Sequence, residues 1–255
     1  MTRLCLAWLL LLCSTPSSLH AQSLTIAAAS DLQGVMPEVV DAFERATGGQ
    51  ARVVFGSSGN FFTQIANGAP FDLCFSADID YPQRLEKAGL TTPGTLFEYA
   101  TGRLVLWSLK GTPVDLGQGL RALLAPSVRR VAIVNPDHAP YGRAAVDALK
   151  KANVYEKVRR KFVLGENVSQ AAQFAESGNA EAGLLPLALA TSASLARSGA
   201  YFEIPATLYA PIEQADIVLK ASRRKDAARA FVEFLKRPDI LQALRDAGFG
   251  APPRR

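Results

Sequence analysis

The chain has 255 residues, of which 49% are hydrophobic, and its 28 lysines and arginines against 23 acidic residues give a formal net charge of +5. The basic residues are dispersed in short clusters that are not interleaved with aromatic side chains, which excludes the usual pattern of a nucleic-acid groove. Beyond residue 21, no run is long and apolar enough to cross a bilayer.

The first 21 residues have the layout of a secretory signal peptide. Arg3 gives a positive start, residues 4–13 form an apolar stretch, and residues 14–21 are small and polar. We expect cleavage after Ala21 and secretion without membrane insertion, while an anchor through a lipid on Cys13 stays open. About 234 residues remain, enough for one large or two medium domains. The mature chain keeps only Cys74 and therefore has no internal disulfide.

The first part of the mature chain alternates apolar runs with helical patterns. Strands are predicted over residues 24–29, 51–55 and 71–76, and helices over residues 35–46, 61–67 and 80–88. The strand runs are nearly all apolar, as in a sheet that is buried on both faces. This order predicts a parallel sheet covered by helices.

A second α/β series follows two extended runs, 95–100 and 103–109, on either side of Gly102. Strands are predicted over residues 131–134, 161–164, 182–185 and 200–204, and helices over residues 141–152, 168–177 and 187–196. A strand at 214–219 and helices at 225–235 and 239–247 close the chain. The sequence therefore predicts an α/β protein of two lobes, each a mainly parallel sheet flanked by helices, with a ligand cleft between them.

Two small hydroxyl residues, Ser30 and Ser58, stand where a predicted strand gives way to a helix. The unpaired N–H groups and the dipole of a helix start favour an anion, and a hydroxyl adds another donor. Alternatively, both serines are ordinary N-caps, and Asp31 is a favourable acid in a first helical turn. The two junctions are equivalent points of adjacent βα units, which favours a shared anion site.

The predicted second lobe has two further junctions of this kind. Residues 135–141 precede a helix, with Pro140 fixing its entry and Gly142 allowing close approach, and residues 166–169 open another helix. Four helix starts around one cleft can surround a small tetrahedral anion with N–H and O–H donors. Burial without a countercharge is tolerable only if nearly every oxygen is hydrogen-bonded, which favours fully deprotonated oxyanions.

Catalytic patterns are weak. His138 is the one histidine of the mature chain, and a secreted serine hydrolase would have to pair it with Ser58. The run from Gly56 to Asn60 resembles a nucleophile elbow, but Asn60 occupies the place of the second glycine. Metal-ligand clusters and a phosphate-cradling loop are absent from the sequence. We therefore expect a binding protein without cofactors rather than an enzyme.

The chain resembles the periplasmic molybdate-binding proteins of ABC importers, which have the type II periplasmic binding protein fold. The resemblance covers essentially the whole mature chain and keeps the family's order. The matching stretches are residues 27–32, 55–58, 69–73, 76–78, 135–142 and 166–168, and the closing Gly248-Phe249.

The resemblance implies four ligand residues for molybdate, which would be held through its oxygens and not by direct metal ligands. Ser30 and Ser58 would give hydroxyl and backbone donors, and Tyr141 and Val168 would give backbone N–H groups. Some members add a tyrosine hydroxyl where this chain has Pro186, so Tyr141 is a candidate to supply the phenol instead. The fifth ligand and the anion preference stay open.

The resemblance also implies how the lobes are divided and what the protein does. Residues 22–101 and 214–255 would form a discontinuous first lobe, and residues 102–213 the second. The chain would be a monomer that captures molybdate, and tungstate too, for the membrane permease of an ABC importer. The alternatives are a binding protein of the same fold for sulfate or a small organic acid, and the hydrolase; a regulator domain is disfavoured by the signal peptide.

Overall fold

The first of two sheets in the structure is built around the N-terminal strand. The computed structural model describes residues 23–252, so the predicted signal peptide lies outside the described residues. The strands lie in the order β2-β1-β3-β10-β4. Their bounds are β1 Leu24–Ala29, β2 Ala51–Gly56, β3 Leu73–Ser76, β4 Phe97–Gly102 and β10 Ile212–Val218. β1 is parallel to β2 and β3, whereas β10 is antiparallel to β3 and β4.

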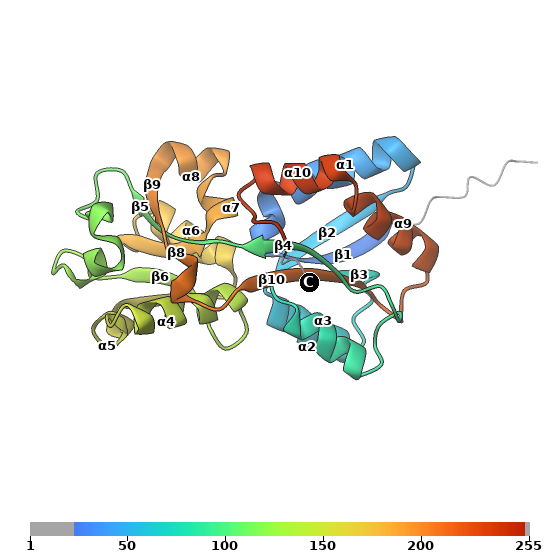
Figure 1. The fold of residues 1–255 in the computed structure, drawn as a ribbon, viewed down its shortest axis with the longest axis horizontal. Coiled ribbons are helices and arrows are strands. Elements are labelled where there is room, and N and C mark those ends of the chain that lie inside the picture. Colours follow the sequence, from blue (N-terminus) through green and yellow to red (C-terminus); the bar gives the residue numbers. More distant parts are fainter. Residues whose placement is uncertain (1–22, 253–255) are drawn as a thin grey trace, which may run out of the picture.

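Helices cover both faces of this sheet (Figure 1). They are the 3-10 helix η1 Ser30–Gly34 and the α-helices α1 Met36–Thr47, α2 Ser58–Ala66, α3 Asp80–Lys87, α9 Lys225–Leu235 and α10 Pro238–Asp246. Aromatic side chains fill the layer between α1, α9 and the sheet, with the rings of Phe43 and Phe231 4.9 Å apart. The C-terminal helices thus complete the lobe that the N-terminal strands begin.

The second sheet has the order β7-β6-β8-β5-β9 and stands beside the first (Figure 1). Its strands are β5 Leu104–Leu109, β6 Val131–Val134, β7 Phe162–Gly165, β8 Ala182–Pro186 and β9 Gly199–Glu203. Its helices are η2 Leu116–Leu124, α4 Pro140–Lys151, α5 Tyr155–Val158, η3 Arg159–Lys161, α6 Val168–Glu176, α7 Leu187–Ala190, α8 Ala193–Ser198 and η4 Ala206–Leu208. The fully buried Trp107 anchors its core, and its indole N–H donates to the Leu195 carbonyl.

The predicted class, two α/β lobes with sheets flanked by helices, is confirmed, but the sheets are mixed and not mainly parallel as predicted, because each lobe also receives strands that return antiparallel. β6 is parallel to β7 and β8, while β5 runs antiparallel to β8 and β9. Only Arg103 separates β4 of the first sheet from β5 of the second, and the chain returns between β9 and β10. The lobe boundaries at 101 and 213 stay a prediction. Within the described part of the chain, no helix has the length and apolarity to span a membrane.

The predicted helix over residues 187–196 is wrong as a single element. The structure has two short helices, α7 and α8, with Ser192 in an extended conformation between them. Thr191 ends α7, and its hydroxyl donates to the Leu187 carbonyl one turn back and to Ala247 outside the helix. Serine and threonine offer the backbone such alternatives to a helix, which explains the break.

Asp216 of β10 is a buried acid with a consequence for stability. Burial raises the pKa of its carboxyl well above the usual value, and neither oxygen has a hydrogen-bond partner among the described residues. A folded-state pKa above the unfolded value means that stability is lost as pH rises from the unfolded pKa towards the folded one.

Asp216→Asn should therefore raise the free energy of unfolding at pH 8 by about 1–3 kcal/mol, because the amide is neutral in both states whereas the carboxyl must take up a proton or stay charged when it is buried. The gain should shrink as pH falls to 5, because pH 5 lies nearer the pKa of the unfolded carboxyl and burying the acid then costs less free energy. Urea unfolding at both pH values measures this, and an equal effect at both would contradict it.

Candidate oxyanion-binding site

Neighbouring parallel strands of the first sheet end level with one another. Ala29 at the end of β1 stands opposite Gly56 at the end of β2, and Ala28 pairs with Phe75 of β3. The residues that follow these strands therefore emerge at one edge of the sheet. Ser30, Ser58 and Ala77 are brought together there, as the carboxyl-end rule for parallel sheets predicts.

Two helix starts of the second lobe face the same edge. β6 and β7 also end in register, with Val134 opposite Gly165. Pro140 occupies the first position of α4, where its missing N–H costs nothing. The side chain of Asn167 caps α6 by accepting from the Gln170 N–H at 3.0 Å. The first N–H groups of both helices are left without intrahelical partners.

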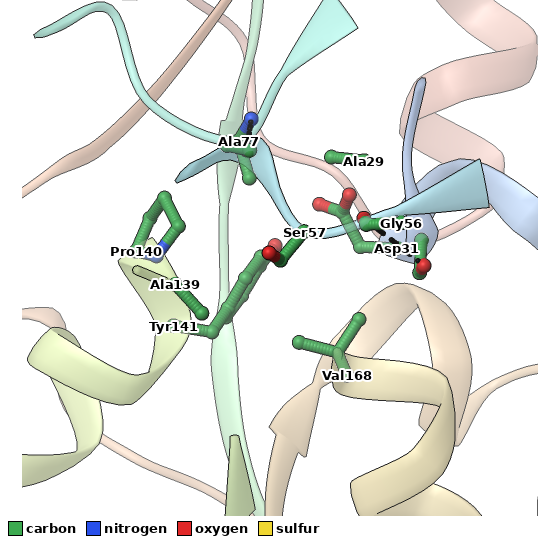
Figure 2. A pocket seen from close by; sticks show the side chains of 11 residues that line it. Ala29, Asp31, Gly56, Ser57, Ala77, Ala139, Pro140, Tyr141 and Val168 are labelled. Carbon is green, nitrogen blue, oxygen red and sulfur yellow. Dashed lines mark hydrogen bonds between the residues drawn. The ribbon is translucent and has the colours of Figure 1, made fainter. Parts of the chain in front are cut away.

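A small cavity lies between these four chain segments, and Figure 2 shows residues of both lobes converging on it. The cavity is small, with a volume of about 10 Å³. None of the described residues that line it is a lysine, arginine or histidine. They are Ala29, Ser30, Asp31, Gly56, Ser57, Ser58, Ala77, Ala139, Pro140, Tyr141 and Val168. All four predicted ligand residues are thus brought together, although their roles as ligands stay a prediction.

The hydroxyl of Ser58, which lines the cavity, keeps a hydrogen to donate. Ser58 is the first residue of α2, and the preceding Ser57 is the N-cap, its Oγ accepting from the Asn60 N–H at 3.3 Å. The Oγ of Ser58 accepts from the Ala77 N–H at 2.9 Å. That bond occupies the oxygen as an acceptor and leaves its hydrogen for another group.

Ser30 differs from the N-cap alternative considered from the sequence. It lies inside η1, whose N-cap is Ala29 without a side-chain cap, so a capping role for Ser30 is wrong. Its hydroxyl donates to the Gly56 carbonyl at 3.1 Å across the strand ends. Because a hydroxyl rotates freely about its C–O bond, the same group can turn its hydrogen to a bound anion.

Tyr141 links the cavity to the strand that returns to the first lobe. The residue is buried, and its hydroxyl oxygen accepts from the Gln214 side-chain amide at 3.1 Å. Burial raises the pKa of Tyr141 well above the usual value, so its phenol is neutral, and its hydroxyl is hydrogen-bonded to the carboxyl of Asp31. A Cβ on Gly102 of β4 would lie 2.4 Å from this hydroxyl, so only glycine fits there.

Asp31 is the residue that the sequence reasoning missed as part of the site. It is buried beside Ser30. Burial raises the pKa of its carboxyl to about 6, although the hydrogen bonds with Gln214 and Tyr141 act to lower that pKa. The signal was its position directly after Ser30 at the same strand end. It was interpreted as a first-turn acid because that explanation suffices for an exposed helix start.

Contacts between the lobes hold the cavity closed. The Gly59 N–H donates to the His138 carbonyl at 3.0 Å. Arg143 of α4 forms a salt bridge with Asp78, which follows β3. Ser169 of α6 donates to the side chain of Gln33 in η1. Each contact needs the two lobes in this arrangement, so each contributes to the closed state.

The arrangement does not favour the hydrolase alternative. The Oγ of Ser58 is engaged with Ala77, and the ring nitrogen Nε2 of His138 lies 3.6 Å from Glu166 instead. Among the described residues, no hydrogen bond joins Ser58 and His138, and no group of three or more histidine, cysteine or acidic residues is arranged to hold a metal ion.

The fold and the site together define a two-lobed protein with a small cavity between its lobes. The family model described as "Bacterial extracellular solute-binding protein" matches residues 24–250, and the chain belongs to this family. The molybdate-binding protein ModA of Azotobacter vinelandii is 37% identical over 231 residues, which is 91% of each chain. The ModA of Rhodobacter capsulatus is 38% identical, covering 88% of this chain and 86% of its own.

A solved structure agrees with this assignment. The periplasmic molybdate-binding protein of Azotobacter vinelandii has a TM-score of 0.85 at 34% identity, covering 91% of this chain and 100% of its own. The relatives are binding proteins, which agrees with the expectation that this chain is not an enzyme.

Ser58→Ala should weaken anion binding by about 1–3 kcal/mol, or roughly 5- to 150-fold, because it removes one hydrogen bond to a charged ligand. Ser57→Ala is the matched variant: it should cost about 1 kcal/mol of stability through the lost cap, with little change in affinity. Calorimetric titration and thermal unfolding of both variants test this. The opposite pattern, with Ser57 controlling affinity, would contradict the assignment.

Proposed function

We propose that this protein captures molybdate in the cavity between its lobes and delivers it to the permease of an ABC importer. The cavity carries this proposal: its wall offers hydroxyl and backbone N–H donors from both lobes and, among the described residues, no cationic side chain. Such donors suit a fully deprotonated tetrahedral dianion. The molybdate-binding relatives, at 37% and 38% identity, support the choice of ion.

Ser30, Ser58, Tyr141 and Val168 are proposed as the residues that bind the ion through its oxygens, without a cofactor. Tungstate has the same shape and charge and should bind too. Sulfate has the same charge but shorter bonds to oxygen, so a rigid cage sized for molybdate leaves stretched hydrogen bonds. Each poorly made bond forfeits part of the roughly 1.5–3 kcal/mol that a bond to a charged group contributes.

Delivery requires that the permease distinguish loaded from empty protein. The closed arrangement depends on contacts between the lobes, such as Arg143 with Asp78 and Gly59 with His138. An anion that bridges the lobes shifts the population towards this closed form. We propose that the protein acts as a periplasmic monomer, exported by the signal peptide in residues 1–21.

Isothermal calorimetry with molybdate, tungstate, sulfate and phosphate tests the proposal. We expect tight binding of molybdate and tungstate, with sulfate at least 100-fold weaker, as several weakened hydrogen bonds together would give. Tight sulfate binding without a response to molybdate would mean that the ligand is the smaller sulfate ion and not molybdate. Binding of neither would contradict an oxyanion function.

A further inference from the structure

The carboxyl of Asp31 lies in the wall of a cavity that we propose for a dianion. Figure 2 shows this carboxyl directed towards the middle of the lining residues, near the tip of Tyr141. Asp31 is only 1% exposed, so water cannot screen it from a bound ion. An ionised carboxylate there would repel the ligand.

The hydrogen bonds around Gln214 distinguish the two oxygens of this carboxyl. The Tyr99 hydroxyl donates to Gln214 Oε1 at 2.8 Å, which fixes the direction of the amide. Gln214 Nε2 then donates to Asp31 Oδ2 at 2.5 Å. Oδ1 is buried without a hydrogen-bond partner in the described structure. Oδ2 is therefore an acceptor already in use, and Oδ1 is the atom free to carry a hydrogen.

The charged and titratable groups around Asp31 offer no counterion. Neither the cavity nor the groove on the other side of Asp31 is lined by a lysine, arginine or histidine among the described residues. The elements packed around it contribute Glu38 of α1, Tyr99 of β4, Tyr141 of α4, Asp216 of β10 and Asp246 of α10. α6 and α7 contribute only the uncharged Val168 and Ala188 to these two walls.

We propose that Asp31 is a proton-carrying ligand: in the loaded state its Oδ1 bears a hydrogen and donates it to an oxygen of the anion. The carboxylate takes one proton from solvent, the new O–H bond stays on Asp31, and the dianion keeps its full charge. One proton is thus taken up with each ion bound. This proposal rests on the proposed function and adds a residue and a proton to it.

The titration of Asp31 in the anion-free structure agrees with this step. Burial in the closed arrangement raises the pKa of Asp31 to about 6, so without the anion the carboxyl is mostly ionised at pH 7.5. A dianion in contact with the carboxyl raises that pKa further, since like charges disfavour ionisation. Protonation on binding follows, and molybdate affinity should fall as pH rises above about 6.

Calorimetry of molybdate binding at pH 7.5, in buffers that differ in ionisation enthalpy, counts the protons directly. We expect an uptake close to one per ion in the unaltered protein and close to zero in Asp31→Asn, a neutral side chain of the same shape. Between pH 6 and pH 8 the affinity should fall by about 50-fold in the unaltered protein and by less than about threefold in Asp31→Asn. Any titration of molybdate itself is common to both proteins and cancels in the comparison.

Asp216→Asn is the matched control, because Asp216 is another buried acid but does not line the cavity. Asp216→Asn should keep the full proton uptake. If this variant, and not Asp31→Asn, loses the proton uptake, the proposal is overturned. Molybdate binding without proton uptake would also overturn it while leaving the proposed function intact. Tighter binding of hydrogen phosphate than of molybdate at pH 8 would mean that an ionised Asp31 accepts the ligand's own hydrogen, which overturns both.

Discussion

Replacing Val168 with proline should weaken molybdate binding at least about 100-fold while leaving the fold in place. Val168 is the first residue of α6, where an N–H has no partner within the helix and proline is well tolerated. The preceding Asn167 is extended, with φ −146° and ψ 171°, as a residue before proline must be. The substitution therefore removes one proposed donor, worth about 1.5–3 kcal/mol, and puts a ring carbon in its place at the cavity wall.

Val168→Ala is the matched control because it changes the side chain and keeps the N–H. It should bind molybdate within a few-fold of the unaltered protein, and both variants should unfold at similar temperatures. Calorimetry and thermal unfolding together distinguish a lost ligand from a lost helix. Equal affinities of the proline and alanine variants would exclude the Val168 N–H as a ligand.

The second large effect is expected at Gly59, where the two lobes touch. A Cβ on Gly59 of α2 would lie 2.6 Å from both the Cβ and the carbonyl oxygen of His138 in the other lobe. The backbone of His138 has little room to move without opening the cleft. Gly59→Ala should therefore disfavour closure by about 1–3 kcal/mol, the cost of overpacking, and lower molybdate affinity by about 5- to 150-fold.

The same substitution should not weaken the first lobe. Alanine is a better helix former than glycine by up to about 1 kcal/mol, and the remaining close contact is with the end of the Tyr81 side chain. We expect an unchanged or raised melting temperature without ligand, and scattering profiles that stay open when molybdate is added. Asn60→Ala, at the exposed neighbouring position, is the control and should close normally. Normal closure of the Gly59→Ala variant would show that the contact between Gly59 and His138 does not control closure of the two lobes.

Apolar runs, together with the glycines and prolines that mark helix ends and starts, were enough to predict most of this fold from sequence. The strand predicted over residues 24–29 is β1, and the one predicted over residues 131–134 is β6, with the same bounds. The pattern of apolar runs does not predict the order and direction in which strands from distant parts of the chain pair. β10 joins its sheet by antiparallel pairing with β3 and β4, and an apolar run is the same in either direction.

The site was predictable to the extent that it depends on strand ends and helix starts. The four predicted ligand residues meet because parallel strands end at the same edge of a sheet. The topology alone therefore predicts that these residues come together, without knowledge of their side-chain contacts. They are Ser30, Ser58, Tyr141 and Val168. The roles of Asp31 and Gln214 could not be predicted from the sequence, because they depend on burial and on a contact between residues 183 positions apart. Local sequence around either residue does not reveal that pairing.

In the proposed complex, hydroxyl and backbone N–H donors of both lobes hold a doubly negative ion without a cationic side chain. A crystal structure of the protein with molybdate tests it most directly. We expect the ion between the lobes, with its oxygens within hydrogen-bond distance of Ser30, Ser58, Tyr141 and Val168 and no lysine or arginine touching it. A lysine or arginine in contact with the ion, or an ion bound elsewhere with this cavity vacant, would contradict the proposed binding site.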